Sequence, residues 1–282
     1  MSLIQVNCEL QYQVSTPTSF LFHVSAARTS HQSVQQEDIQ VVPANCYDIC
    51  HLGSEDNRFL RFETQPGNLT LSYEAKVNLT PVVDNPPQIQ EAEYPQLPEE
   101  VLPYLNPSRY CESDRMVSFA SAEFGQLQRG YSRVAAICDW THGYLQYQSG
   151  STDASTGACD MLVLRHGVCR DYAHLAIALC RALCIPARYV AGYAVALKPP
   201  DFHGFFEAYL GDHWYLFDAT RLAPREGFVR IGMGRDAADV PFATIIGGAT
   251  LIKKTVNAQE LTEEIPPQQS ETVTDEPAVS TA

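Results

Sequence analysis

The chain has 282 residues, 45% hydrophobic and 18% charged, which is typical of a globular protein long enough to bury a core. Its formal net charge of −14 argues against nucleic-acid binding, because phosphate contacts need basic patches. No apolar run approaches 18 residues and the N-terminus has no basic or apolar leader, so we expect no membrane span and no signal peptide. Nine cysteines without a framework spacing favour reduced thiols in a cytoplasmic protein.

The first 80 residues have the pattern of a β-sandwich. Alternating or apolar runs lie at residues 8–14, 20–24, 39–42, 58–63 and 68–79, separated by turn-rich segments. We therefore predict an N-terminal β-sandwich domain over residues 1–85, with no catalytic residues of its own. Cys46, Cys50 and His51 are candidate metal ligands, but no second pair with zinc spacing follows, so we expect neither a metal nor a cofactor.

A proline-rich segment follows the predicted sandwich, and it indicates a surface linker over residues 86–110. Beyond it, helical periodicity predicts helices at 113–128 and 131–147, and a short helix at 159–165. Three aromatic residues of this region, Trp140, Tyr144 and Tyr147, lie at helical spacing. They either line a substrate cleft or belong to the core.

The segment at 171–183 is rich in Ala and Leu and lacks Gly and Pro, which predicts a buried helix. Cys169 then lies in or near the first turn, where free backbone N–H groups and the positive end of the helix dipole favour a thiolate. Asp171 fits a helix-start residue, and His174 fits a hydrogen-bonded core histidine. From the helix alone, Cys169 is either a reactive cysteine or another buried cysteine such as Cys180.

A buried strand is predicted at 187–196 and a hairpin after it. The strands of the hairpin, at 203–210 and 213–218, flank the dipeptide Gly211-Asp212, which is a signal for a two-residue turn. Such a turn places Leu210 opposite His213 and fixes the register of the whole hairpin.

In that register His203 is the diagonal neighbour of Asp218 on one face of the sheet, within reach of a side-chain hydrogen bond. On the same face, Glu207 is expected to meet a buried partner such as Arg188. A low-pKa cysteine candidate on the preceding helix completes a set of nucleophile, base and orienting group, which is typical of a cysteine hydrolase or acyltransferase. Cys169, His203 and Asp218 are therefore the candidate catalytic residues.

Three blocks of this sequence match a known pattern in order and spacing. They are GVCRDYAHLAIALCRALCIPARYVAGY at 167–193, His203 with Glu207 four residues later, and Trp214 followed by FDAT at 217–220. Over roughly residues 130–245 the chain resembles the transglutaminase-like superfamily, whose pattern reads G-x-C-x-D-x-A, R-x-x-G-I-P-A-R-x-V-x-G-Y, H-A-W-x-E and W-x-x-x-D-P-T. The resemblance implies Cys169 as nucleophile, His203 as base and Asp218 as orienter. One departure, Gly204-Phe205 in place of Ala-Trp, leaves the shape of the substrate pocket open.

The nearest branch of that family is the bacterial transglutaminase-like proteins, often described as cysteine proteases, which carry an extra N-terminal β domain. The segment GRDAADVPF at 234–242 is similar to their C-terminal block. The resemblance implies an α+β, papain-like core in which the Cys169 helix packs on an antiparallel sheet. We expect this catalytic domain at 111–256 and an acidic, disordered tail at 257–282.

The resemblance implies attack by the Cys169 thiolate on a peptide or carboxamide carbonyl, with a peptide or protein as substrate. The Cys169 backbone N–H is one expected oxyanion donor, and the sequence does not identify a second. Relatives favour water as the acceptor of the thioester, but a transamidating cross-linker and a catalytically silent peptide-binding module stay open as alternatives. No oligomeric state follows from the sequence.

Overall fold

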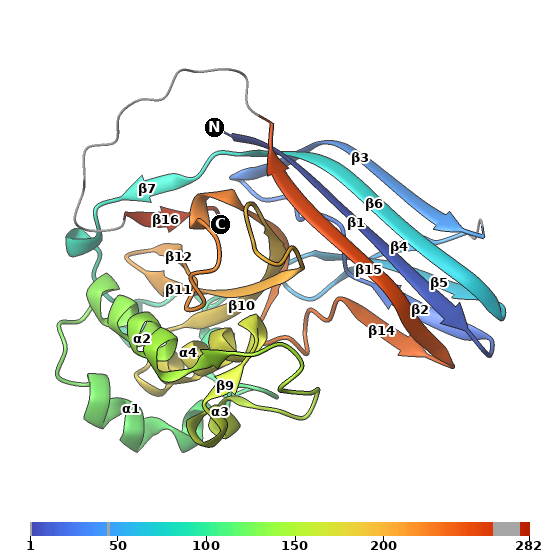
Figure 1. Ribbon diagram of the computed structural model, residues 1–282. Coiled ribbons are helices and arrows are strands. Elements are labelled where there is room, and N and C mark those ends of the chain that lie inside the picture. The colour runs from blue at the N-terminus through green and yellow to red at the C-terminus, as the bar shows by residue number, and fades with distance from the viewer. Residues whose placement is uncertain (1, 44–45, 262–276) are drawn as a thin grey trace.

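The computed structural model describes residues 2–43, 46–261 and 277–282. It contains a β-sandwich and an α+β core, which lie side by side in Figure 1. The predicted fold class is confirmed: helices cover one antiparallel sheet of the core, and strands from the N-terminal part of the chain build most of the sandwich.

The sandwich consists of two antiparallel four-stranded sheets. The first has the order β15-β1-β6-β3, formed by β1 (Ser2–Val14), β3 (Gln32–Val42), β6 (Gly67–Leu79) and β15 (Ala249–Glu260). The second has the order β14-β2-β5-β4, formed by β2 (Thr18–Phe22), β4 (Asp48–Leu52), β5 (Asn57–Thr64) and β14 (Ala243–Ile246). Apolar residues alternate along β1 and β6 with half-exposed ones, so each strand gives one face to the core between the sheets.

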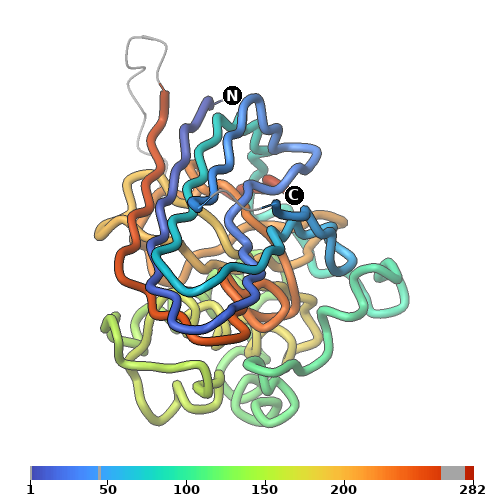
Figure 2. Tube along the Cα trace, turned by 90° about the vertical axis from the view of Figure 1, so that its right-hand side faces the viewer, coloured from blue at the N-terminus to red at the C-terminus, as the bar shows by residue number. Residues whose placement is uncertain are grey.

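The C-terminal part of the chain returns to complete this sandwich. Strand β15 pairs with β1 over nearly its whole length, and β14 pairs with β2. Figure 2 shows the red strand running beside the blue ones. The expected catalytic domain at 111–256 includes β14 and most of β15, but the structure pairs both with N-terminal strands, so the sandwich draws on both ends of the chain.

The core is built on a second antiparallel sheet with the order β12-β11-β10-β13. Its strands are β10 (Ala187–Ala194), β11 (His203–Leu210), β12 (His213–Phe217) and β13 (Phe228–Gly234). The hairpin register is as predicted: Leu210 pairs with His213, and the turn residues Gly211 and Asp212 both have positive φ angles.

Four helices and a small sheet accompany this sheet. They are α1 (Val117–Phe124), α2 (Tyr131–Tyr144), α3 (Ala158–Leu164), α4 (Cys169–Ala182) and the parallel pair β8 (Gln146–Tyr147) and β9 (His166–Gly167). The predicted helix at 113–128 is shorter in the structure, where a 3₁₀ turn at Ser113–Arg115 precedes α1. The predicted helix at 131–147 ends at Tyr144, because the chain turns extended there to form β8.

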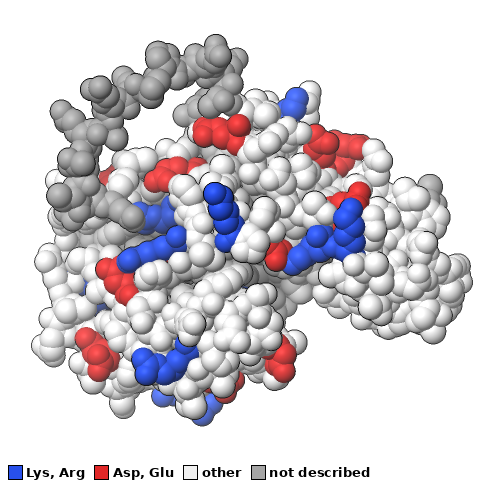
Figure 3. All heavy atoms as spheres, viewed as in Figure 1, with Lys and Arg blue, Asp and Glu red and all other residues white. Residues whose placement is uncertain are grey.

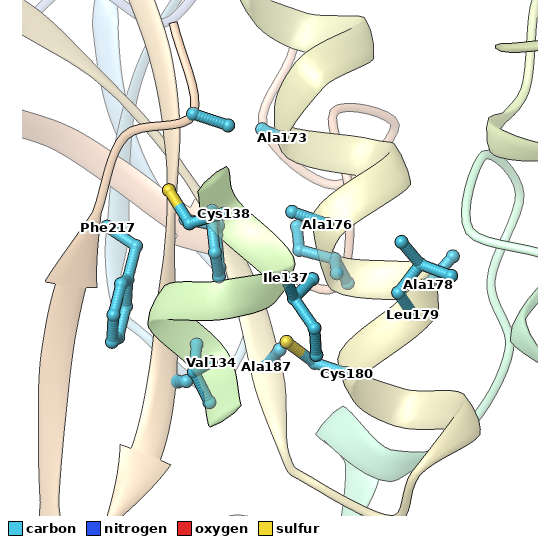
Figure 4. Packing of buried hydrophobic residues seen from close by; sticks show 14 of the residues in the cluster. Val134, Ile137, Cys138, Ala173, Ala176, Ala178, Leu179, Cys180, Ala187 and Phe217 are labelled. Atoms are coloured by element: carbon cyan, nitrogen blue, oxygen red, sulfur yellow. The ribbon is translucent and has the colours of Figure 1, made fainter. Parts of the chain in front are cut away.

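Helix α4 lies at the centre of the core. Its Ala173, Ala176 and Cys180 are fully or almost fully buried, and these small side chains let α2 approach closely with Val134 and Ile137. Figure 4 shows this contact between the two helices. Because α4 is packed on all sides, its first residue is held by a rigid element.

The proline-rich segment is more than a surface linker. It follows strand β7 (Val82–Asp84) and contains three short 3₁₀ turns, at Pro86–Gln88, Tyr94–Gln96 and Leu102–Leu105. Val101 is buried and packs with Tyr209 of the core hairpin. The segment therefore follows the core and contributes apolar contacts to it.

The prediction of a disordered tail is wrong for the last residues. Of the tail at 257–282, residues 257–260 belong to β15, and residues 262–276 lie outside the described residues. Strand β16 (Ala278–Ser280) pairs with β7, and Ala278 and Val279 have no exposed surface. The prediction was based on the average composition of the whole tail, which does not show a short apolar segment at its end.

Acidic and basic side chains lie interspersed over the face of the molecule shown in Figure 3. In the part of the chain that the structure describes, no helix is both long and apolar enough to cross a membrane.

Candidate active site

Cys169 is the first residue of α4, as the sequence predicts. Val168 before it is extended, and its N–H donates to the Asp171 carboxylate (2.9 Å), which caps the helix start. Asp171 also accepts a hydrogen bond from Thr152. Cys169 is half-buried at the positive end of the helix dipole, and it is still open to a substrate.

The hairpin brings His203 and Asp218 together. Nε2 of His203 and Oδ2 of Asp218 are 2.9 Å apart, and both side chains are almost completely buried. Thr220 holds the carboxylate in place, because its backbone N–H and its hydroxyl both donate to Asp218 Oδ1 (2.9 and 2.8 Å). The sequence contains Thr220 in its FDAT block, but nothing in the spacing assigned it this role.

The electrostatics of His203 point to a charged imidazole. Burial by itself lowers its pKa, but the charge and hydrogen bond of Asp218 and the interaction with the Cys169 side chain raise that pKa to about 10. Since Asp218 occupies Nε2, the other ring nitrogen is left for the sulfur. The histidine thus stands between the cysteine and the carboxylate, as the nucleophile–base–orienter arrangement requires.

The fully buried cysteines of the core lack such a partner. Burial raises the pKa of the Cys111 thiol to about 12 and holds the pKa values of Cys138 and Cys180 well above the ordinary range. The surroundings of Cys169 therefore differ from those of the buried cysteines. This difference favours the interpretation of Cys169 as a reactive cysteine over that of one more buried cysteine.

Tyr147 is a residue of this site whose role the sequence left undecided. It lies on β8, which pairs in parallel with β9, the strand directly before α4. The other two aromatic residues of that region, Trp140 and Tyr144, stack on each other in the helical layer, with 4.4 Å between their ring centroids. The Tyr147 hydroxyl contacts both the backbone N–H and the side chain of Cys169. Burial and then the charge of Cys169 raise the pKa of Tyr147 to about 12, so the hydroxyl keeps its proton.

The other predicted contacts are also present. Nε2 of His174 accepts a hydrogen bond from the backbone N–H of Ala237 (3.1 Å), so His174 is a buried core residue as expected. Arg188 donates through Nε to Glu207 (2.7 Å), so Arg188 is the buried partner expected for Glu207, and the two residues pair across β10 and β11. Neither residue touches the Cys169 thiol.

One cavity bears on ligand binding. A cavity of about 960 Å³ lies between α2 and the loop after β12; it reaches Asp218 but neither Cys169 nor His203. Gly204 and Phe205, the departure from the family pattern, are buried. No cluster of three or more His, Cys, Asp or Glu that could hold a metal occurs within 2–43, 46–261 and 277–282.

Known proteins are similar to this chain in both sequence and fold. The profile of the transglutaminase-like superfamily matches residues 119–219, and that of the bacterial transglutaminase N-terminal domain matches residues 2–99. A solved structure from Cytophaga hutchinsonii, described as a "Putative Cysteine Protease", is 40% identical with a TM-score of 0.93, covering 100% of this chain and 98% of that one. This chain belongs to the transglutaminase-like superfamily. The N-terminal sandwich is thus the bacterial transglutaminase N-terminal domain, completed here by β14 and β15.

Curated relatives match only part of this chain. An uncharacterised protein of Mycobacterium leprae is 29% identical over 153 residues, which cover 51% of this chain and 55% of that protein. An uncharacterised protein of Mycobacterium tuberculosis is 36% identical over 110 residues, 34% of this chain and 35% of its own length. The matches therefore span about half or less of these curated relatives.

Proposed function

We propose that this transglutaminase-like protein is a cysteine hydrolase that cleaves peptide or carboxamide bonds through Cys169, His203 and Asp218. One observation carries the proposal. A half-exposed cysteine at a helix start interacts with a buried histidine, and a buried carboxylate fixes that histidine at 2.9 Å. The similarity to the Cytophaga hutchinsonii protein supports the same class of activity.

In the first step the Cys169 thiolate attacks the carbonyl carbon of the substrate, forming a C–S bond and an oxyanion. The oxyanion forms next to the sulfur, so the Cys169 backbone N–H is one donor to it. The Tyr147 hydroxyl is the second, because it already contacts that N–H and the Cys169 side chain. A substrate oxygen that enters there receives one hydrogen bond from the N–H and one from Tyr147.

In the second step His203, as imidazolium, transfers its proton to the departing amine, the C–N bond breaks and a thioester remains. Asp218 stabilises the charged imidazole and holds the ring orientation throughout. Neutral His203 then takes a proton from water, which attacks the thioester and releases a carboxylate and the free Cys169 thiol. We expect peptides or proteins as substrates.

Alkylation tests this proposal without knowledge of the substrate. Iodoacetamide at slightly acidic pH, followed by peptide mapping, is expected to label Cys169 ahead of the other eight cysteines, with Cys180 as the internal control. Cys169→Ala is expected to abolish turnover and leave the melting temperature unchanged. Uniformly slow labelling would favour a catalytically silent peptide-binding module.

The acceptor of the thioester is tested with a peptide library and a lysine-like amine, analysed by mass spectrometry. We expect cleaved or deamidated peptides and little incorporated amine. Efficient incorporation into a glutamine peptide would contradict hydrolysis and make the protein a transamidating cross-linker.

A further inference from the structure

Gly204, next to His203, makes an unusually close contact with Tyr189. A β-carbon at position 204 would lie 2.3 Å from the Tyr189 hydroxyl oxygen, closer than real β-carbons approach another atom, and 3.0 Å from Cζ. The family pattern has Ala at this position, directly after the histidine. In this chain the Tyr189 hydroxyl occupies the space in which that β-carbon would lie.

Tyr189 cannot easily move away from this contact. It lies on β10, where it is 3% exposed, and its ring packs against His174 (5.2 Å between centroids). His174 in turn stacks on Tyr110 (5.1 Å) and is hydrogen-bonded to Ala237. The hydroxyl is therefore held by a packed column of rings and can act as a fixed spacer.

The hydroxyl also belongs to the surroundings of the nucleophile. Gly204 and Tyr189 lie on the side of the core sheet that packs on α4, the helix that begins with Cys169. Burial first, and then the charge of Cys169, hold the pKa of Tyr189 well above its usual range, so the hydroxyl stays protonated and available as a donor.

We propose that Tyr189 is a positioning residue: its hydroxyl, seated against Gly204, sets the spacing between His203 and Cys169 and stabilises the thiolate–imidazolium pair. This inference rests on the proposed cysteine hydrolase function and deepens it. It explains why glycine follows the histidine in this chain, since any larger residue would push β11, and with it His203, away from the sulfur.

The test measures the pH dependence of Cys169 alkylation by iodoacetamide in the full chain, together with the melting temperature. Tyr189→Phe keeps the ring and removes only the hydroxyl. Because hydrogen bonds to charged groups are strong, loss of this proposed donor to the thiolate is expected to raise the pH midpoint of alkylation by about one unit or more. The matched control is Tyr193→Phe on the same strand, whose hydroxyl donates to the carbonyl of Val24 (2.7 Å) and is expected to leave the midpoint unchanged.

A second variant tests the steric part. Gly204→Ala is expected to lower the melting temperature and slow Cys169 alkylation, because the new methyl group clashes with the hydroxyl. In the double variant with Tyr189→Phe the 2.3 Å clash with the hydroxyl is gone, although Cζ at 3.0 Å remains a tight contact. The melting temperature should then recover in part, and the midpoint should stay near that of Tyr189→Phe alone, so the two changes are not additive.

The outcomes separate the two proposals. A wild-type protein in which Cys169 is not labelled preferentially overturns both. Normal wild-type labelling with an unchanged midpoint in Tyr189→Phe overturns the role of Tyr189 only. A Gly204→Ala variant that matches the wild type in stability and labelling also overturns it, because the close contact would then have no consequence.

Discussion

Removal of the last five residues, 278–282, is predicted to destabilise the protein strongly. Strand β16 adds to β7, and the side chains of Ala278 and Val279 are completely buried. Arg230, which is also completely buried, donates to both the carbonyl oxygen and the hydroxyl of Thr281. The deletion therefore exposes an apolar slot and takes two acceptors from a buried guanidinium group.

The magnitude follows from these contacts. Burial of a valine side chain is worth about 1.5–3 kcal/mol, and a buried donor without its acceptor costs about 1–3 kcal/mol, or more when it is charged. Together the losses are on the order of 2.5–6 kcal/mol, a large part of the roughly 5–15 kcal/mol that stabilises a typical protein. At about 2–4 °C per kcal/mol, we expect the melting temperature to fall by roughly 5–25 °C.

The assay is thermal unfolding of the full chain and its variants, followed by circular dichroism. Thr281→Val keeps the volume and removes the hydroxyl acceptor, and Val279→Ala shortens the buried side chain; each is expected to give part of the loss. Val83→Ala is the control, because Val83 pairs with Val279 but is 56% exposed. A deletion variant that melts within 2 °C or so of the wild type would refute the reasoning, as would equal effects of Val83→Ala and Val279→Ala.

Three further predictions concern the candidate site and the charges beneath it. The pKa of His203 is raised in the folded state, from 6.5 to about 10, so its contribution to stability is full below pH 6.5 and is lost as the pH rises towards 10; urea midpoints of wild type and His203→Gln across this range should converge at high pH. Asp218→Asn removes the charge that raises this pKa, and turnover of a cleaved peptide should fall by on the order of 10³–10⁴ while the fold persists. Glu207→Gln leaves the buried Arg230 without its carboxylate and should cost about 3–5 kcal/mol in urea unfolding; a loss below 1 kcal/mol or so would show that Arg230 finds another partner.

The candidate site could be predicted because its determinants are local in sequence. The Ala- and Leu-rich run after Cys169 specifies a helix, and the Gly-Asp turn specifies the register that brings His203 to Asp218. Each of these features depends on neighbours within about 15 residues, so periodicity and turn chemistry suffice to read them.

The features that the sequence did not reveal depend on distant partners. Buried and exposed residues do not alternate regularly along β15, and its sequence does not indicate that it pairs with β1 instead of the core sheet. The contact between Tyr189 and Gly204 arises from the stagger of β10 and β11, which no pattern on either strand states. Strand β16 has only three residues, so it could not be recognised from the average composition of an acidic tail.

Strand β11, which carries the candidate base, shows why both ends of the chain accompany the core. His203 begins β11, and Glu207, four residues later, is completely buried between Arg188 and Arg230. Arg188 also reaches Glu55 of the sandwich domain (2.9 Å), while Arg230 bonds to Thr281 beyond β16.

Removal of one partner from such a buried cluster leaves a charge without compensation, which is far more costly than an apolar gap. The strand that carries the candidate base is thus fixed by an acidic residue of the N-terminal segment and a carbonyl of the C-terminal one. We infer that the core segment alone cannot satisfy its own buried charges. The completed sandwich and the docked C-terminus therefore belong to the structure that positions His203.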